Sequence, residues 1–222
     1  MKRFLFFAAL ALLSVDGYCH DWANLACYRE ANDSVMQLDA SRREIVLLGN
    51  SITYNWARDH REFLEENHMV GRGISGQTTT HFLARFRQDV LNLKPQTVVI
   101  LGGTNDIAEN AGEYNEDLTM SNIQSMVELA RANGIRPVLC TVLPVTQYRW
   151  NKDVPNVQDK IDSLNRRITA YAKENKIPLV DYFTPMAMPD RTMNPKYAED
   201  GVHPNLAGYA VMEKLLLEAL GK

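Results

Sequence analysis

Short, almost continuously apolar runs alternate along this chain with longer segments of helical periodicity. The runs lie at residues 44–48, 69–70, 97–101, 137–142 and 178–180. A strand that is apolar along its whole length is buried on both faces, which is typical of a parallel sheet covered by helices. The alternation therefore predicts an α/β fold: a three-layer α/β/α sandwich around a five-stranded parallel sheet.

The segments between the runs carry the helical pattern. We expect helices at residues 59–67, 79–93, 119–133, 157–175 and 206–220. In the third of these, apolar residues recur every three or four positions, and Asn133 and Gly134 supply a helix end. Such a helix has one face that packs on the sheet.

Size and composition limit the class of protein. The chain has 222 residues, of which 45% are hydrophobic and 23% charged, which fits a soluble globular protein and not a disordered or polytopic membrane chain. Its formal charge is -3, from 24 Lys and Arg against 27 Asp and Glu, and it contains no dense basic run. We therefore expect no nucleic-acid partner.

The N-terminus has the pattern of a secretory signal. Lys2 and Arg3 precede an apolar stretch at residues 4–13, and Gly17 follows at a position suited to cleavage. The stretch is too short to span a bilayer, so no integral membrane segment is expected after cleavage. Residues 1–17 are thus predicted to be a signal peptide of an exported, periplasmic or extracellular protein. An N-terminal segment, 18–43, and a folded α/β domain, 44–222, would follow.

The cysteines leave two readings open. Cys19 and Cys27 are spaced so that a local disulfide is possible in an oxidising compartment, but the spacing does not require one. Cys140 lies in an apolar run and is predicted to be a buried thiol. Lipidation at Cys19 is disfavoured because the bulky Tyr18 precedes it.

Polar, glycine-rich turns follow the first three predicted strands, at residues 49–53, 71–76 and 102–106. In an open parallel sheet, ligands bind beyond the carboxyl ends of the strands, where the connections diverge. A fourth polar turn, residues 200–204, follows the last strand after a loop rich in proline and methionine. We expect the site at this edge of the sheet.

These turns contain the parts of a serine hydrolase. Asp200 and His203 are three residues apart, which allows the carboxylate to fix the tautomer of the imidazole. Ser51, exposed on a tight turn, is the candidate nucleophile that such a base would activate. The reaction creates an oxyanion, for which the backbone N–H groups of Ser51 and Gly76 and the amide of Asn105 are candidate donors.

The four turns together resemble the ordered sequence blocks of the SGNH hydrolases, also called GDSL esterases, in their acetylhydrolase-like branch. The blocks here are Gly-Asn-Ser-Ile, Gly-Ile-Ser-Gly-Gln-Thr, Gly-Gly-Thr-Asn-Asp and Asp-Gly-Val-His-Pro. The resemblance implies a flavodoxin-like fold and ester hydrolysis without metal or cofactor. It implies that Ser51 is the nucleophile, His203 the base and Asp200 the residue that orients the base. The oxyanion donors would be Ser51, Gly76 and Asn105.

One position departs from the family pattern, because Asn50 stands where the family usually has aspartate. That position organises the turn and is not the base, so an amide can replace the acid. Ser51 is not followed by the glycine of a nucleophile elbow, which disfavours an ordinary α/β-hydrolase. His20, His60, His68 and His81 lack a carboxylate cluster at ligand spacing, so no metal site is expected.

The substrate is predicted from the aromatic residues near the site. Trp56 follows the nucleophile turn, and Tyr148 and Trp150 lie in the loop after the fourth strand. Such side chains can contact a sugar ring, and no apolar lid for a long acyl chain is evident. We expect a short-chain, O-acetyl ester on a carbohydrate. A lysophospholipase, a thioesterase and a non-catalytic glycan-binding module remain alternatives.

Overall fold

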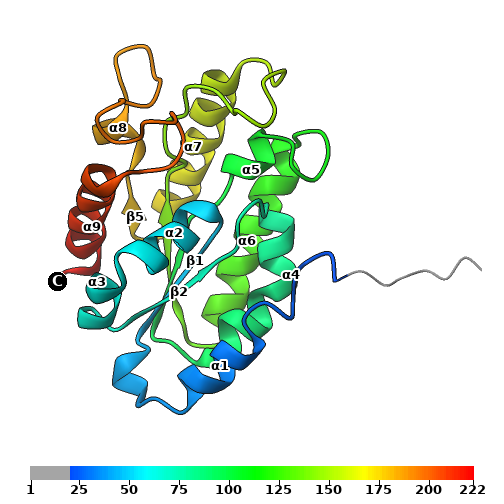
Figure 1. The fold of residues 1–222 in the computed structure, drawn as a ribbon. Helices are drawn as coiled ribbons and strands as arrows, with labels where there is room; N and C mark the ends of the chain where they lie inside the picture. The colour runs from blue at the N-terminus through cyan, green and yellow to red at the C-terminus, as the bar shows by residue number, and fades with distance from the viewer. Residues whose placement is uncertain (1–20) are drawn as a thin grey trace, which may run out of the picture.

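A computed structural model describes residues 21–222, which contain a five-stranded parallel sheet with helices on both faces (Figure 1). The strands are β1 (Ile45–Gly49), β2 (Met69–Gly73), β3 (Thr97–Ile100), β4 (Arg136–Cys140) and β5 (Leu179–Val180). Their order in the sheet is β2-β1-β3-β4-β5, so the connections diverge between β1 and β3. The predicted three-layer, flavodoxin-like fold is confirmed.

Each face of the sheet is covered by its own group of helices. One group is α2 (Ser51–Asp59), α3 (Arg61–Glu66) and α9 (Leu206–Leu220), and the other is α4 (Thr79–Asp89), α6 (Glu116–Ala132) and α7 (Val157–Glu174). Figure 1 shows α3 and α9 on one side of the strands and α4 and α6 on the other. The remaining elements are short: α1 (Arg29–Met36), α5 (Thr104–Ile107), α8 (Phe183–Met186) and the 3-10 turns η1 (Ala40–Arg42) and η2 (Leu91–Leu93).

Successive side chains of β1 alternate between two separate apolar clusters. Val46 and Leu48 belong to a cluster that includes Phe82 of α4, whereas Ile45 and Leu47 belong to a cluster on the other face. Because strand side chains alternate between faces, an uninterrupted apolar strand serves both layers of helices at once. This is the physical reason why the five apolar runs predicted the architecture.

The first helix of the domain differs from its expected bounds. We expected residues 59–67, but α2 already begins at Ser51, and the chain bends at His60 before α3. The glycine-rich sequence before Ser51 suggested only a turn. In the structure, Asn50 caps a helix that starts immediately after the strand.

The N-terminal segment, as far as it is described, contacts the α/β domain. Gln77 donates from Nε2 to the carbonyl of Ala23 at 2.7 Å, and Asn32 of α1 donates from Nδ2 to Asp89 Oδ1 at 2.8 Å. The predicted signal peptide, residues 1–17, lies outside the described residues. Within residues 21–222, no helix is both long and apolar enough to cross a membrane.

Cys140 is buried at the end of β4, as predicted, and burial raises the pKa of its thiol. Cys27 is exposed. The structure does not test the possible disulfide with Cys19, because Cys19 lies outside the described residues.

Candidate active site

Ser51 is the first residue of α2 and follows almost directly on the end of β1. Gly49 is required at the strand end, because a Cβ there would lie 2.0 Å from Thr53 Oγ1. Asn50 caps the helix, since its Oδ1 accepts a hydrogen bond from the N–H of Ile52 at 3.1 Å. An amide thus organises the turn in the way expected of the family's aspartate. Ser51 lies at the positive end of the helix dipole, which favours negative charge nearby.

The fold brings Ser51, His203 and Asp200 into one hydrogen-bonded row. Ser51 Oγ lies 2.9 Å from His203 Nε2, although 152 positions separate the two residues in the sequence. On the other side of the ring, His203 Nδ1 lies 2.7 Å from Asp200 Oδ2. When Nδ1 carries the proton and donates to the carboxylate, Nε2 is left to accept the proton of the serine hydroxyl. The arrangement can generate a base-activated nucleophile.

Asp200 is held by the backbone as well as by the imidazole. Its Oδ1 accepts hydrogen bonds from the N–H groups of Val202 at 2.9 Å and His203 at 2.7 Å. Burial alone would raise the pKa of Asp200, but the hydrogen bonds from the ring and backbone of His203 and from Val202 lower that pKa below its ordinary value. The ionised carboxylate is therefore favoured, and it can stabilise a protonated imidazole.

The expected oxyanion donors border one pocket of about 360 Å³. Gly76 has φ +79°, a conformation that glycine adopts without strain. Asn105 is buried, and its Nδ2 donates to the carbonyl of Gln77 at 3.0 Å. An amide nitrogen carries two N–H donors, and this bond uses one while it fixes the orientation of the group. The pocket is lined by Ser51, Asn55, Ser75, Gly76, Asn105, Asn110, Trp150 and His203.

Asp106, next to Asn105, ties the loop after β3 to the beginning of α4. Its carboxylate accepts hydrogen bonds from the N–H of Thr79 at 3.1 Å and from Thr79 Oγ1 at 2.5 Å. Burial raises the pKa of Asp106, and the hydrogen bonds from Thr79 and Thr119 oppose that rise only in part. These hydrogen bonds restrain the backbone next to Asn105 and so help to fix the position of its amide.

Trp150 is the predicted aromatic residue that the structure places at the pocket. Its side chain lines the cavity and is 47% exposed, so a ligand can reach the ring. The indole Nε1 donates to Asn110 Oδ1 at 2.8 Å, and the ring centroid lies 6.1 Å from that of His203. Asn110 also donates from Nδ2 to the carbonyl of Gly76 at 3.0 Å. One asparagine therefore links the aromatic side chain to the glycine turn.

The prediction that Trp56 and Tyr148 contact substrate is wrong, because both side chains are buried. Trp56 is 2% exposed and donates from Nε1 to Glu213 Oε1 at 3.1 Å. Five residues along a helix correspond to a rotation of about 500°, which turns Trp56 away from Ser51 and toward the core. Tyr148 is fully buried, and its ring supports Trp150 at a centroid distance of 5.3 Å.

Three further residues at the pocket were not predicted from the sequence. Asn55 lies four positions after Ser51 on α2, so helical spacing would have placed both on one face. Ser75 belongs to the glycine-rich turn after β2 and is identifiable by that position. Asn110 lies in a loop, and nothing in its sequence context points to the site.

Two other histidines, His60 and His81, make local contacts. His60 Nδ1 lies 2.8 Å from Glu213 Oε1, and His81 Nδ1 accepts from the N–H of Thr78 at the beginning of α4. In the part of the chain that the structure describes, no group of three or more His, Cys, Asp or Glu side chains is arranged to hold a metal ion.

Comparison with known proteins places this geometry in a family context. The chain matches the model of the GDSL-like Lipase/Acylhydrolase family over residues 47–211. Its structure is similar to that of a GDSL-like lipase from Bacteroides thetaiotaomicron, with 48% sequence identity and a TM-score of 0.87 over 90% of this chain and 98% of that one.

Two curated relatives match shorter parts of the chain. A lipoprotein of Bacillus subtilis is 30% identical over 121 residues, which are 47% of this chain and 50% of the relative. An acetylxylan esterase of Xylanibacter ruminicola is 24% identical over 152 residues, which are 60% of this chain and 30% of the relative. The chain thus spans half or less of the length of these two proteins.

Proposed function

Because the chain belongs to the GDSL-like lipase/acylhydrolase family, we propose that it is a carboxylic ester hydrolase that acts through a covalent acyl-enzyme on Ser51. The observation that carries this proposal is the unbroken row from Ser51 Oγ through His203, at 2.9 Å, to Asp200, at 2.7 Å. A serine becomes a nucleophile when an oriented base removes its proton as it attacks.

The proposed reaction has two halves, acylation of Ser51 and hydrolysis of the acyl-enzyme. Ser51 Oγ bonds to the ester carbonyl carbon while His203 Nε2 takes the hydroxyl proton, and the carbonyl electron pair moves to oxygen. Collapse of this tetrahedral intermediate breaks the bond to the leaving alkoxide, which receives the proton from His203. Water then attacks the acyl group by the same route, which releases the carboxylic acid and restores Ser51.

The negative charge of the intermediate is stabilised by the N–H groups of Ser51 and Gly76 and by the amide of Asn105. All three residues border the same pocket as His203. Two of these donors are main-chain groups, and Asn105 is held by its bond to the carbonyl of Gln77. Fixed donors stabilise developing charge without a cost of reorientation during the reaction.

The pocket supports a short acyl group on a carbohydrate alcohol. It is small, at about 360 Å³, and asparagine and serine side chains form much of its wall. Trp150 offers the sugar an exposed ring, fixed by Asn110. The similarity to an acetylxylan esterase points to the same substrate class. We also propose that the protein is exported, from the signal pattern of residues 1–17 and the similarity to a lipoprotein.

A substrate panel tests this proposal. The mature protein is labelled with a fluorophosphonate and assayed on p-nitrophenyl esters of increasing length, acetylated xylan, lysophospholipids and acyl thioesters. We expect labelling that Ser51→Ala abolishes, and kcat/KM that is highest for acetyl esters. Each methylene buried in a long channel would add about 0.8 kcal/mol, so kcat/KM that rises with acyl length would instead indicate a lipid substrate. Absence of labelling in folded protein would indicate a binding module.

A further inference from the structure

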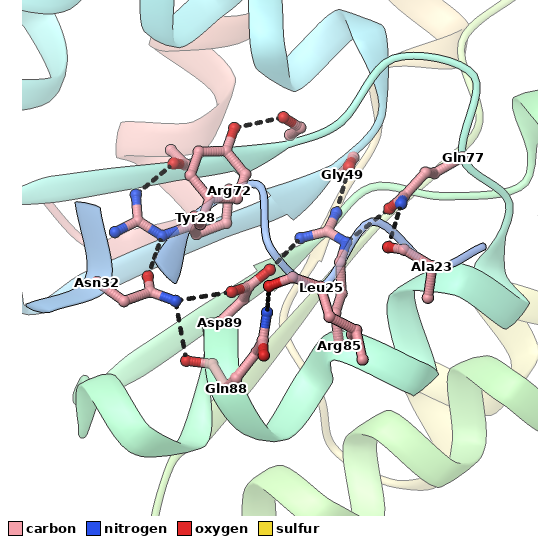
Figure 2. A network of polar contacts seen from close by, with 12 residues as sticks. Ala23, Leu25, Tyr28, Asn32, Gly49, Arg72, Gln77, Arg85, Gln88 and Asp89 are labelled. Atoms are coloured by element: carbon pink, nitrogen blue, oxygen red, sulfur yellow. Dashed lines mark hydrogen bonds and ion pairs between the residues drawn. The ribbon is translucent and has the colours of Figure 1, made fainter. Parts of the chain in front are cut away.

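Arg85 of α4 is a fully buried guanidinium group that contacts three different parts of the chain. Its Nε donates to Gln77 Oε1 at 2.6 Å, Nη1 contacts Asp89 Oδ2 at 3.0 Å, and Nη2 donates to the carbonyl of Gly49 at 2.9 Å. Figure 2 shows the guanidinium between these three acceptors. A planar fork with several fixed donors defines the relative positions of its acceptors far better than a single contact does.

Two of these acceptors belong to the turns that carry the candidate site. Gly49 ends β1 two residues before Ser51, and its carbonyl also accepts the N–H of Ile74 at 3.2 Å. Gln77 directly follows Gly76, and its backbone carbonyl accepts the amide N–H of Asn105 at 3.0 Å. Arg85 therefore connects the turn that carries Ser51 with the turn that carries Gly76 and orients Asn105.

The network around Arg85 places several charged side chains in the core. Arg72 is also buried, and its Nε donates to Asn32 Oδ1 at 2.8 Å, while Asn32 Nδ2 donates to Asp89 Oδ1 at 2.8 Å. Among the described residues of this network, Asp89 is the carboxylate that Arg85 contacts directly, and Arg72 is linked to it only through the Asn32 amide (Figure 2). Buried ions cost several kcal/mol each, and apolar residues of similar volume often stabilise a core at least as well. For Arg85, whose bonds reach Gly49 and Gln77, a role in placing the turns of the candidate site accounts for the cost of its burial.

Residues of the N-terminal segment make further hydrogen bonds to this network and to the turn after β2. The Gln77 side chain is held on one side by Arg85 and on the other by the carbonyl of Ala23. Gln88 donates to the carbonyl of Leu25 at 2.5 Å, and the hydroxyl of Tyr28 donates to the carbonyl of Gly73. The N-terminal segment thus contacts the turn after β2 and holds the Gln77 side chain next to Arg85.

We propose that Arg85 is a positioning residue, which sets the placement of the oxyanion donors relative to Ser51 through its bonds to Gln77 and Gly49. This inference rests on the proposed function. Displacement of reacting groups by about 1 Å can reduce the rate 10²-fold even when the altered residue is remote from the chemistry. The effect should fall on the transition state, because the donors act on charge that develops only there.

The test compares Arg85→Lys with the matched control Arg72→Lys. Both substitutions keep a buried positive charge and remove a fork. Arg72, however, contacts Asn32, the carbonyl of Gly71 and the ring of Tyr28, none of which lines the candidate site, and its replacement removes no bond between Arg85 and Gln77 or Gly49. For p-nitrophenyl acetate we expect Arg85→Lys to lower kcat by about 10- to 100-fold with little change in KM. The affinity for a phenylboronic acid, which mimics the tetrahedral intermediate, should fall in parallel with kcat/KM. Arg72→Lys should lower the melting temperature alone.

Equal kcat values for the two folded variants, or unchanged boronate affinity in Arg85→Lys, would overturn the proposal. Gln77→Met serves if Arg85→Lys does not fold, since it leaves the Arg85–Asp89 pair and the backbone carbonyl for Asn105 in place. We expect its kcat to fall about tenfold, and a wild-type kcat would again overturn the proposal. If the wild-type protein neither hydrolyses the ester nor reacts with the fluorophosphonate, the proposed function itself fails.

Discussion

Asp200 contacts His203 through both carboxylate oxygens: Oδ2 lies 2.7 Å from the ring nitrogen Nδ1, and Oδ1 accepts a hydrogen bond from the backbone N–H of the same residue, also at 2.7 Å. The imidazole is thus fixed both in tautomer and in its position relative to the chain. Because the hydrogen bonds lower the pKa of Asp200, the carboxylate that makes these two contacts is ionised.

Asp200→Asn is expected to lower kcat by about 10⁴-fold while the protein stays folded, because the amide can favour the wrong imidazole tautomer and adds no negative charge. Steady-state kinetics and circular dichroism check both parts. Activity close to that of the wild type would mean that another carboxylate orients His203.

The same substitution gives a prediction about pH. A carboxyl whose pKa is lower in the folded than in the unfolded chain stabilises the fold above its unfolded pKa, and this contribution disappears as the pH falls through the folded value. The difference in unfolding free energy between wild type and Asp200→Asn should therefore be constant near neutrality and shrink below about pH 4. Urea unfolding at a series of pH values measures it. A difference that grows in acid would contradict the lowered pKa.

Ser51→Ala and His203→Ala should each remove several orders of magnitude of kcat, and the double variant should lose little more than either alone. The two side chains act in one step at a separation of 2.9 Å, so removal of one leaves the other without a partner. A kinetic double-mutant cycle gives the result. Additive losses would show that the residues act independently.

The sheet and the candidate site were predictable for one reason: each polar turn follows a buried strand. In a parallel sheet the strand ends align, and Gly49 of β1 lies opposite Gly73 of β2. Turns that are distant in sequence therefore meet at one edge. Knowledge of the strands was enough to bring Ser51 and Asn105 together, without any information about side-chain packing.

Side-chain direction was not predictable in the same way. Trp56 was expected at the substrate because it is close to Ser51 in sequence, but the turn was not recognised as the first turn of α2, whose rotation buries the indole. Arg85 shows the opposite difficulty. A charged residue in the middle of a helix is usually exposed, and only the packing of α4 against β1 and the N-terminal segment reveals its contacts.

Asn105→Ala should lower kcat by about 10²- to 10³-fold with little change in KM, because the lost donor acts on charge that appears only during the reaction. Its amide also donates to the carbonyl of Gln77, so part of the loss can reflect a shift of the Gly76 turn. Asn105→Asp retains the size of the side chain without the donor and should be at least as impaired. A higher KM with unchanged kcat would make Asn105 a substrate-binding residue.

Asn50 gives a prediction about stability. Asn50→Ala removes the helix cap and should cost about 1 kcal/mol of unfolding free energy, or a decrease of roughly 2–4 °C in Tm. Asn50→Asp can still accept the N–H of Ile52 and places negative charge at the beginning of α2, so its Tm should match or exceed that of the wild type. Thermal unfolding of both variants decides. Equal destabilisation by alanine and aspartate would exclude the cap as the source of stability.

Trp150→Ala should weaken hydrolysis of an acetylated xylo-oligosaccharide more than that of p-nitrophenyl acetate, whose leaving group needs no sugar platform. Loss of remote contacts can lower turnover as well as affinity, so kcat/KM is compared for both substrates. Asn110→Ala should move the ratio in the same direction, because it releases the indole that Asn110 Oδ1 holds at 2.8 Å.

Trp56→Phe provides the matched control, since it also removes an indole close to Ser51 in sequence, but from the core. It should lower Tm and leave the ratio of the two kcat/KM values unchanged. If Trp150→Ala impairs both substrates equally, the ring contributes to the pocket without recognising the carbohydrate, and the serine mechanism is unaffected. If Trp56→Phe changes the ratio as Trp150→Ala does, the effect comes from general loosening of the fold, and the sugar platform is rejected.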